Sequence, residues 1–268
     1  PWLPENLLGE VRLMTFKARD GLMLDGYVTL PADHVPDRPA PMVVLPHGGP
    51  WARDVWGYHP EAQFFASRGY VVFQPNYRGS TGYGADISIT PRAEFRRMHD
   101  DVTDGTRALI RSGIADPARI AIVGTSFGGY LAVCGAAFEP DLYRCAVTIA
   151  GIFDWERVMR EARNLDPDPY RYEQLLRMLG DPRKLQEKFE AMSPFHSVSQ
   201  IKVPVFVAHG GDDRVADSSQ SRRLTKALTK ARVPHETMFR TDEGHGFSEL
   251  KNRVELYERV ESFLKKHL

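Results

Sequence analysis

The stretch Gly124-Thr125-Ser126-Phe127-Gly128-Gly129 decides the fold of this chain. The apolar run 119–123 before it predicts a buried parallel strand, and the small-residue run 130–137 after it predicts a helix packed on the sheet. A Gly-x-Ser-x-Gly sequence between strand and helix is typical of a nucleophile elbow, a sharp turn that exposes a serine hydroxyl. Glycines at 124 and 128 would let two backbone segments pass closely there. The alternative interpretation is a glycine-rich turn with an incidental serine.

Composition limits the possible partners. The chain has 268 residues, 42% of them hydrophobic, and its 35 basic residues balance its 35 acidic ones. We therefore expect no nucleic acid or other polyanion as a partner. No apolar run approaches the roughly 18 residues of a membrane span, and no signal-peptide core is visible, so we expect no membrane partner.

Cysteine and histidine spacing predicts neither disulfides nor metal. Cys134 and Cys145 both lie in apolar runs and form no disulfide framework. No set of His, Cys, Asp and Glu has metal-ligand spacing, so we predict no metal and no other cofactor. The cysteines leave the compartment open, and the cytoplasm is favoured slightly. Because the chain opens with Pro1 and not with methionine, we expect a processed product or a portion of a longer protein.

The remaining chain predicts one domain over residues 1–268. Period-two runs at 11–17 and 22–30 predict an antiparallel hairpin at a sheet edge. Further strands and helices then alternate, which is typical of a mostly parallel, doubly wound sheet and, with the elbow, of an α/β-hydrolase fold. The polar helical segment of about 152–192 interrupts this alternation and predicts a small cap. The other expected strands are 42–45, 70–74, 144–150, 203–208 and 236–239, and the other expected helices are 61–68, 100–112, 218–231 and 253–266.

A serine nucleophile needs a base beside it and an acid that orients the base. In this fold these groups follow in the order Ser, Asp or Glu, His, each after a strand. Ser126 is thus the candidate nucleophile and His245 the candidate base, while the loop after strand 203–208 offers both Asp212 and Asp213 as the acid.

Three other histidines are given structural roles. His209 ends a strand, and we expect it to brace its loop with a hydrogen bond. His47 is expected to position the turn 47–50. His99, beside two aspartates, is expected to be solvated or to start a helix.

An oxyanion hole needs two backbone amides aimed at the developing negative charge. The residue after the serine, Phe127, would supply one amide. Gly49, in the loop after strand 42–45, is the candidate for the second, because without a side chain it would let the substrate carbonyl approach. The alternative is that residues 47–50 form only a tight turn.

The motifs together resemble the catalytic domain of the prolyl oligopeptidase family of serine peptidases, nearest to its acylaminoacyl-peptidase and dipeptidyl-peptidase-like members. The resemblance covers nearly the whole chain. It rests on five motifs in order: Leu45-Pro46-His47-Gly48-Gly49-Pro50, Asn76-Tyr77-Arg78-Gly79-Ser80-Thr81-Gly82-Tyr83-Gly84, Gly124-Thr125-Ser126-Phe127-Gly128-Gly129-Tyr130, Asp212-Asp213-Arg214-Val215 and Glu243-Gly244-His245-Gly246.

The resemblance implies a substrate-binding region as well as a triad. Arg214 matches an arginine that binds a substrate carbonyl in some members. The acid loop is one residue shorter than in many members, and counting back from Arg214 favours Asp212 over Asp213 as the acid. An apolar pocket for the substrate side chain would be lined by Phe127, Ile152, Trp155, Val158 and Val215. The alternative for Trp155 is a buried core aromatic.

The expected function is hydrolysis of short peptides or acyl-peptides through an acyl-enzyme. A carboxylesterase on the same fold and a non-catalytic scaffold are the alternatives. Full-length members of the family carry an N-terminal β-propeller, which this chain lacks, so a propeller is a partner only if the native chain is longer. A homo-oligomer is possible, and the sequence leaves exopeptidase and endopeptidase modes open.

Overall fold

An eight-stranded sheet runs through the part of the chain that the computed structural model describes, residues 4–84, 87, 94–164 and 168–268. Its order is β1-β2-β4-β3-β5-β6-β7-β8. β1 and β2 form an antiparallel hairpin at one edge, β2 is antiparallel to β4, and every further pair is parallel. The strands are β1 (Glu10–Lys17), β2 (Met23–Leu30), β3 (Ala40–Val44), β4 (Val71–Pro75), β5 (Ala115–Thr125), β6 (Cys145–Ile149), β7 (Val205–Gly210) and β8 (His235–Arg240).

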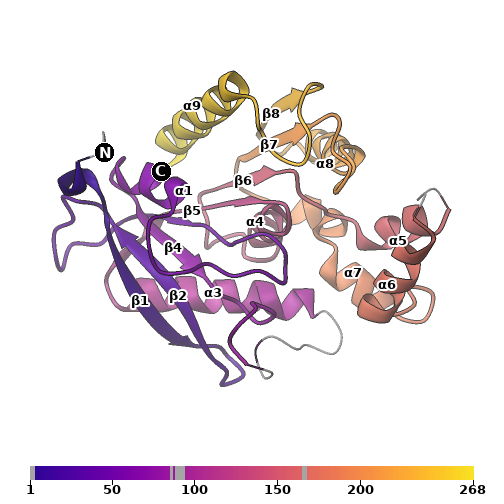
Figure 1. Cartoon of the computed structure of the whole chain (residues 1–268), viewed down its shortest axis with the longest axis horizontal. Coiled ribbons are helices and arrows are strands. Elements are labelled where there is room, and N and C mark those ends of the chain that lie inside the picture. The colour runs from indigo at the N-terminus through magenta and orange to yellow at the C-terminus, as the bar shows by residue number, and fades with distance from the viewer. Residues whose placement is uncertain (1–3, 85–86, 88–93, 165–167) are drawn as a thin grey trace.

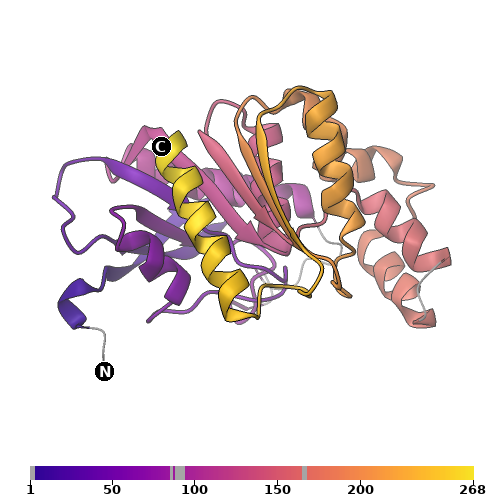
Figure 2. The same cartoon turned by 90° about the horizontal axis from the view of Figure 1, so that it is seen from above.

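Helices cover both faces of this sheet (Figure 2). Helices α3, α4 and α8 pack on one face, and α1 and α9 pack on the other, each group with its own apolar cluster. The described helices are α1 (Pro60–Ala66), α3 (Phe95–Arg111), α4 (Phe127–Phe138), α5 (Trp155–Asn164), α6 (Pro169–Leu179), α7 (Gln186–Met192), α8 (Ser219–Lys230) and α9 (Leu250–His267), with 3₁₀ turns at Glu5–Leu7 and Pro194–Gln200.

The central strand β5 shows why the sheet needs helices on both sides. Ile120 and Ile122 face the α3–α4 side, whereas Ala121 and Val123 face the α1–α9 side, and all four are fully buried. A strand buried on both faces has a continuous apolar sequence, which is the pattern of parallel sheets.

The predicted fold class is confirmed, and the helical insertion also lies where it was expected. Helices α5, α6 and α7 follow β6 and project beyond one end of the sheet, away from the β1–β2 hairpin (Figures 1 and 2). Part of this insertion, residues 165–167, lies outside the described residues. No helix within the described ranges is both long enough and apolar enough to cross a lipid bilayer.

Two element boundaries were predicted wrongly. α3 begins at Phe95 and not near Asp100, because Phe95 and Met98 are buried against the core although no capping side chain marks the start. β5 begins at Ala115, where it pairs with Ala40, ahead of a register shift in the β3–β5 ladder. This early pairing is not apparent from the sequence, because Asp116 and Pro117 are residue types that are rare in strands.

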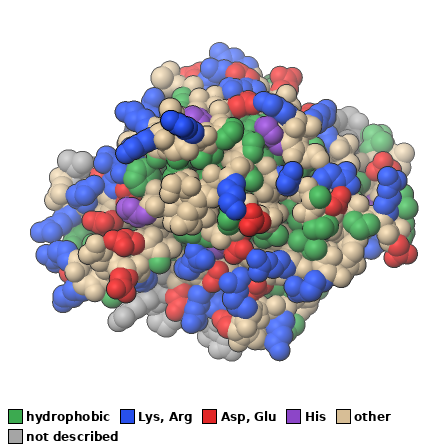
Figure 3. All heavy atoms as spheres, turned by 180° about the vertical axis from the view of Figure 1, so that it is seen from behind, with side chains coloured by type: hydrophobic (Ala, Val, Ile, Leu, Met, Phe, Trp, Pro, Cys, Tyr) green, Lys and Arg blue, Asp and Glu red, His purple; other side chains and the backbone are tan. Residues whose placement is uncertain are grey.

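Charges of both signs are interspersed over the surface seen in Figure 3, in keeping with a formal net charge of zero. One ion pair lies inside. Arg78, directly after β4, is largely buried and donates to the fully buried Asp101 of α3 through its Nε and Nη2 atoms, at 2.8 Å each. Its amide also donates to the same carboxylate, so the loop after β4 is tied to α3.

The turn from β5 into α4 passes very close to neighbouring backbone. Ser126 has φ 58° and ψ −120°, and its amide donates to the carbonyl of Ile149 on β6 at 2.8 Å. A Cβ added at Gly124 would overlap the carbonyl of Gly128, and a Cβ at Gly128 would overlap the carbonyl of Pro46. Backbone approaches this close exclude every side chain at both positions.

We expect Gly124→Ala to destabilise the protein by about 3 kcal/mol or more, because the rigid elbow has to move to admit a methyl group. Gly113→Ala is the matched control. Gly113 has a left-handed conformation, with φ 76°, but open space around it. That change should cost only the conformational penalty of about 1–2 kcal/mol. Urea unfolding of both variants measures the difference, and equal losses would contradict the close passage.

Candidate active site

Three predicted side chains meet at the carboxyl ends of the parallel strands. Ser126 follows β5, His245 lies in the loop after β8, and Asp213 lies in the loop after β7. The Nε2 atom of His245 is 2.9 Å from Ser126 Oγ, and its Nδ1 atom is 2.7 Å from Asp213 Oδ2. A carboxylate can only accept, so Nδ1 carries the proton and the Nε2 lone pair faces the serine hydroxyl.

The acidic partner is Asp213 and not Asp212, which corrects the prediction from the sequence. The side chain of Asp213 is fully buried, whereas that of Asp212 is 68% exposed and lies 3.5 Å from Arg214 Nε at the surface. The amide of Asp212 donates to the carbonyl of Glu243 at 3.0 Å, which ties its backbone to the histidine loop and turns the next side chain inward. The side chains of the two neighbouring aspartates do point to opposite sides, but Asp213 points inward and Asp212 points to solvent.

The Asp213 carboxylate is held by four donors. Its Oδ1 atom accepts from the amides of Val215 and Ala216, at 2.8 and 2.9 Å. Its Oδ2 atom accepts from His245 and from His209 Nε2, at 2.7 and 3.0 Å. Burial by itself would raise the pKa of Asp213, but the hydrogen bonds from His209, His245 and the two amides hold that pKa well below its usual value. Asp213 is therefore ionised at neutral pH.

His209 had been expected only to brace its loop. The structure places it on the same carboxylate oxygen as His245, and nothing in the sequence beyond its position at a strand end marks this contact.

His47 lies in the turn beside the serine, and within the described residues its side chain makes no hydrogen bond to Ser126, His245 or Asp213. Its Nδ1 atom donates to the Gly48 carbonyl at 2.7 Å, its Nε2 atom accepts from Ser80 Oγ at 2.9 Å, and its ring stacks on Tyr77. Burial lowers the pKa of His47 to about 4, so this ring is neutral at neutral pH. His47 thus joins the turn 47–50 to the loop after β4.

Two glycines in that turn have different reasons to be glycine. A Cβ at Gly48 would lie 3.5 Å from Ser126 Cβ, so this residue provides the close approach to the serine. Gly49 has φ 127°, and a Cβ there would lie 2.8 Å from the amide nitrogen of Trp51. Gly48 thus lies close to Ser126, while Gly49 is required both by its backbone conformation and by the Trp51 amide beside it. The approach of a substrate carbonyl at Gly49 stays a prediction.

The amide of Phe127 opens helix α4 and has no acceptor within the helix. It is the first of several such amides at the positive end of the helix dipole, directly after the serine. A developing negative charge beside Ser126 would be stabilised there.

A cavity of about 500 Å³ adjoins Asp213 on the side of β6 and β7. It is lined by four of the six residues predicted to form the apolar pocket or to bind a substrate carbonyl: Ile152, Val158, Arg214 and Val215. Its wall also includes Asp213, so the cavity reaches the carboxylate that contacts His245. Arg214 is 86% exposed and stands at its mouth.

Trp155 does not line this cavity. Its ring is 5% exposed and packs among the rings of Phe95, Phe127 and Tyr130, with centroids 4.7, 6.5 and 5.8 Å away. It lies on the buried stripe of α5 together with Met159. The predicted substrate contact at Trp155 is replaced by a place in the core, and the Phe127 ring is also only 4% exposed.

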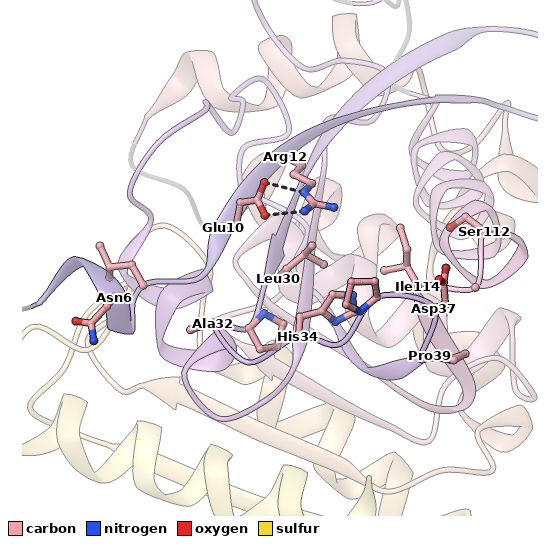
Figure 4. A pocket seen from close by; sticks show the side chains of 14 residues that line it. Asn6, Glu10, Arg12, Leu30, Ala32, His34, Asp37, Pro39, Ser112 and Ile114 are labelled. Atoms are coloured by element: carbon pink, nitrogen blue, oxygen red, sulfur yellow. Dashed lines mark hydrogen bonds and ion pairs between the residues drawn. The ribbon is translucent and has the colours of Figure 1, made fainter.

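A second cavity, of about 550 Å³, lies at the opposite end of the sheet (Figure 4). Pro39 and Ile114 line it directly before β3 and β5, and Glu10 and Arg12 pair across its wall. Because β5 has 11 residues at about 3.3 Å each, this cavity is remote from Ser126.

His99 is neither solvated nor at a helix start, which corrects the sequence prediction. It is fully buried within α3, and potential ligand atoms of His99, Asp100 and Glu139 lie within 4.8 Å of one another. Arginines already neutralise both carboxylates, since Arg19 pairs with Asp100 and Arg107 with Glu139. We therefore assign no metal to this group.

A rigid loop follows the turn at Gly49. Asp54 anchors it: its amide donates to Asn76 Oδ1 at 2.8 Å, and its Oδ1 atom accepts from Gln74 at 3.0 Å. Four large side chains of this loop are nonetheless exposed: Trp51, Val55, Trp56 and Tyr58. Asp54 itself is 8% exposed, and burial raises its pKa to about 6.

This shift predicts how stability changes with pH. The folded protein binds the Asp54 proton more tightly than the unfolded chain, whose pKa is near 3.9. Asp54 should therefore make the free energy of unfolding fall as the pH rises from about 4 through about 6, and should cause no further change once it is ionised in both states. Asp54→Asn should reduce this fall, and at pH 4, where the carboxyl is protonated, it should match the wild type. Chemical unfolding across this range measures both, and an unchanged slope would contradict a raised pKa.

Known proteins resemble this chain over most of its length. The model of the prolyl oligopeptidase family matches residues 56–268. Dipeptidyl aminopeptidase BIII of Pseudoxanthomonas mexicana is 35% identical over 259 residues, which cover 92% of this chain and 37% of the relative. A puromycin-hydrolyzing peptidase of Mycobacterium tuberculosis superposes with a TM-score of 0.90 at 28% identity, over 100% of this chain and 41% of that one.

A further solved structure, the acylaminoacyl peptidase of Pyrococcus horikoshii, has a TM-score of 0.85 at 25% identity. The match covers 97% of this chain and 42% of that chain. The present chain thus spans about two fifths of the length of the relatives it matches.

Proposed function

Because this chain belongs to the prolyl oligopeptidase family, we propose that it is a serine peptidase that cleaves short peptides through an acyl-enzyme. One observation carries the proposal: Ser126 Oγ, the two ring nitrogens of His245 and Asp213 Oδ2 form a continuous chain of hydrogen bonds, at 2.9 and 2.7 Å. Nucleophile, base and orienting acid are thereby in reach of one another before any substrate binds.

In the acylation step the Ser126 oxygen attacks the carbonyl carbon of the scissile amide while its proton passes to His245 Nε2. The carbonyl oxygen takes up the negative charge, and the amides of Phe127 and Gly49 are the proposed donors to it. Collapse of this intermediate breaks the C–N bond, and His245 returns the proton to the leaving amine. The products of this half-reaction are an amine and an ester on Ser126.

In the deacylation step a water molecule replaces the amine. His245 takes a proton from the water as it attacks the ester carbonyl, and then gives that proton to Ser126 as the ester bond breaks. The ionised Asp213 stabilises the imidazolium in both steps, which its lowered pKa supports.

The substrate side chain next to the scissile bond is proposed to enter the cavity beside Asp213, where Ile152, Val158 and Val215 present apolar surface. Arg214 at its mouth is a candidate donor to a substrate carbonyl. Peptides and acyl-peptides are the substrate class that the names of the relatives favour.

A carboxylesterase would use the same groups, so the test must separate amide from ester cleavage. We expect the chain to hydrolyse both an aminoacyl-p-nitroanilide and the matching p-nitrophenyl ester, and to be labelled by a fluorophosphonate. Ser126→Ala should lose the label and about a millionfold in turnover. Cleavage of the ester alone would show that the protein is an esterase and not a peptidase. A wild type that the fluorophosphonate does not label would leave only the interpretation as a non-catalytic scaffold.

The two neighbouring aspartates provide a matched pair of variants. Asp213→Asn should lower kcat about ten-thousandfold, because an amide at this position would hold His245 in the wrong tautomer. Asp212→Asn changes an exposed side chain that makes no contact with His245 within the described residues, and should leave kcat within about twofold. Assays of both on one ester substrate check the assignment, and the reverse ranking would move the acid to Asp212.

A further inference from the structure

A second histidine is bound to the carboxylate of the proposed triad. The ring of His209, at the end of β7, is fully buried, and its Nε2 atom lies 3.0 Å from Asp213 Oδ2. That is the oxygen that also meets His245 Nδ1, at 2.7 Å. One carboxylate oxygen is therefore shared by two imidazoles, only one of which reaches the serine.

The tautomer of His209 follows from its neighbours. Its Nε2 atom faces two acceptors, Asp213 Oδ2 and, at 2.9 Å, the carbonyl of Ala216. Neither can donate, so Nε2 carries a proton and donates to both. On the other side of the ring, Ser221 Oγ of α8 lies 2.6 Å from Nδ1 and is itself fully buried. In the neutral ring the serine hydroxyl donates to Nδ1.

The contact also restrains the carboxylate. The amides of Val215 and Ala216 hold Oδ1. With Oδ1 held alone, Oδ2 can still change its position. A second hydrogen bond, to Oδ2, is needed to fix the orientation of the carboxylate plane. His245 cannot provide that restraint alone, because it is 23% exposed and must itself be oriented by Asp213. His209 is the buried group that holds Oδ2 from the other side.

We propose that His209 is a positioning residue that holds Asp213 Oδ2 in the plane of the His245 ring and takes up part of the carboxylate charge. The proposal rests on the proposed roles of Ser126, His245 and Asp213. It has two consequences. Without the His209 donor, Asp213 would orient His245 less well, which slows turnover. The carboxylate would also interact more strongly with the His245 imidazolium, which favours the protonated and inactive form of the base.

Other charged groups near this cluster have partners of their own. From the histidine loop, Glu243 accepts from Ser248 and Asn252. From the loop before α8, Asp217 accepts from the amide of Ser219, and its pKa is lowered first by Ser219 and further by His209. Further ion pairs on the elements packed around the cluster are Asp212 with Arg214, Asp154 with Arg223, Arg157 with Glu161 and Arg240 with Glu255. Asp242 accepts a hydrogen bond from the side-chain amide of Asn252.

Three variants of the full chain test the proposal. His209→Phe keeps a flat ring and removes the donor; His209→Gln offers an amide N–H in place of Nε2–H. Ser221→Ala is the matched control, because it removes the buried hydrogen bond on the far side of the ring and leaves Asp213 untouched. Rates are measured against pH on one ester substrate and divided by the concentration of sites titrated with a fluorophosphonate, so that misfolded protein does not count.

For His209→Phe we expect kcat to fall about 10- to 100-fold with KM within about threefold, as for a lost positioning contact. The acid limb of the rate profile should move to higher pH by about half a unit or more. His209→Gln should restore most of kcat and the wild-type limb. Ser221→Ala should lower the unfolding temperature and leave the limb in place. An unmoved limb and an unchanged kcat per titrated site in His209→Phe would overturn the proposal.

Proton NMR keeps the proposal testable if His209→Phe does not fold or if the chain proves inactive. The wild type should show two far-downfield N–H resonances, one from His245 Nδ1–H and one from His209 Nε2–H. In His209→Gln the second should vanish and the first should stay near its wild-type position, because the amide N–H takes the place of Nε2–H on the shared oxygen. A wild type with only one such resonance, or a His209→Gln variant that keeps both, would overturn the contact between His209 and Asp213. Failure of the wild type to label with the fluorophosphonate would instead overturn the proposed function.

Discussion

The close passage of the β5–α4 turn over its neighbours is the constraint on which the site depends. The backbone at Gly124 packs directly against the backbone of Gly128. Gly128 in turn packs against the carbonyl of Pro46, in the loop that follows β3. These contacts hold Ser126 in a left-handed conformation at the carboxyl end of β5, with its amide tied to β6. Because the turn is fixed from three sides, the hydroxyl and the first amides of α4 keep a constant relation to each other.

Around this turn, buried polar groups hold the loops that complete the site. Arg78 ties the loop after β4 to α3, Asp54 ties the loop after Gly49 to β4, and His47 joins the two loops through Ser80. On the other side Asp213 collects four donors from its own loop and from two histidines. Removing one partner from such a network leaves a buried charge or acceptor unsatisfied, which costs more than an exposed contact would. The loops therefore behave as parts of the scaffold.

The same logic explains how burial distributes the ionisation states. Asp213 is ionised because its hydrogen bonds outweigh the cost of burial, whereas His47 is neutral because burial outweighs its one bond to a carbonyl. Asp54 lies between these cases, since a single amide donor only partly offsets burial. The balance between burial and hydrogen bonding thus sets the direction in which each pKa moves.

The sequence by itself determined those features that depend on local residue patterns. Alternating and continuous apolar runs predicted the hairpin, the parallel strands and the helical insertion, and the elbow motif with a histidine after the last strand predicted which groups would meet. Expectations failed where local signals were absent or misleading. No cap marks the start of α3, and Asp116 and Pro117 hide the first part of β5.

Only the tertiary structure decided the identity of the acid, the burial of Trp155 and the place of His209. Asp212 and Asp213 have the same chemistry and adjacent positions, so the choice depends on a backbone bond from Asp212 to Glu243, 31 residues further on. Trp155 is turned to the core by aromatic rings of α3 and α4, and His209 meets its carboxylate through the turn that follows β7. Such contacts form between elements distant along the chain or across a closed turn, and no local periodicity encodes them.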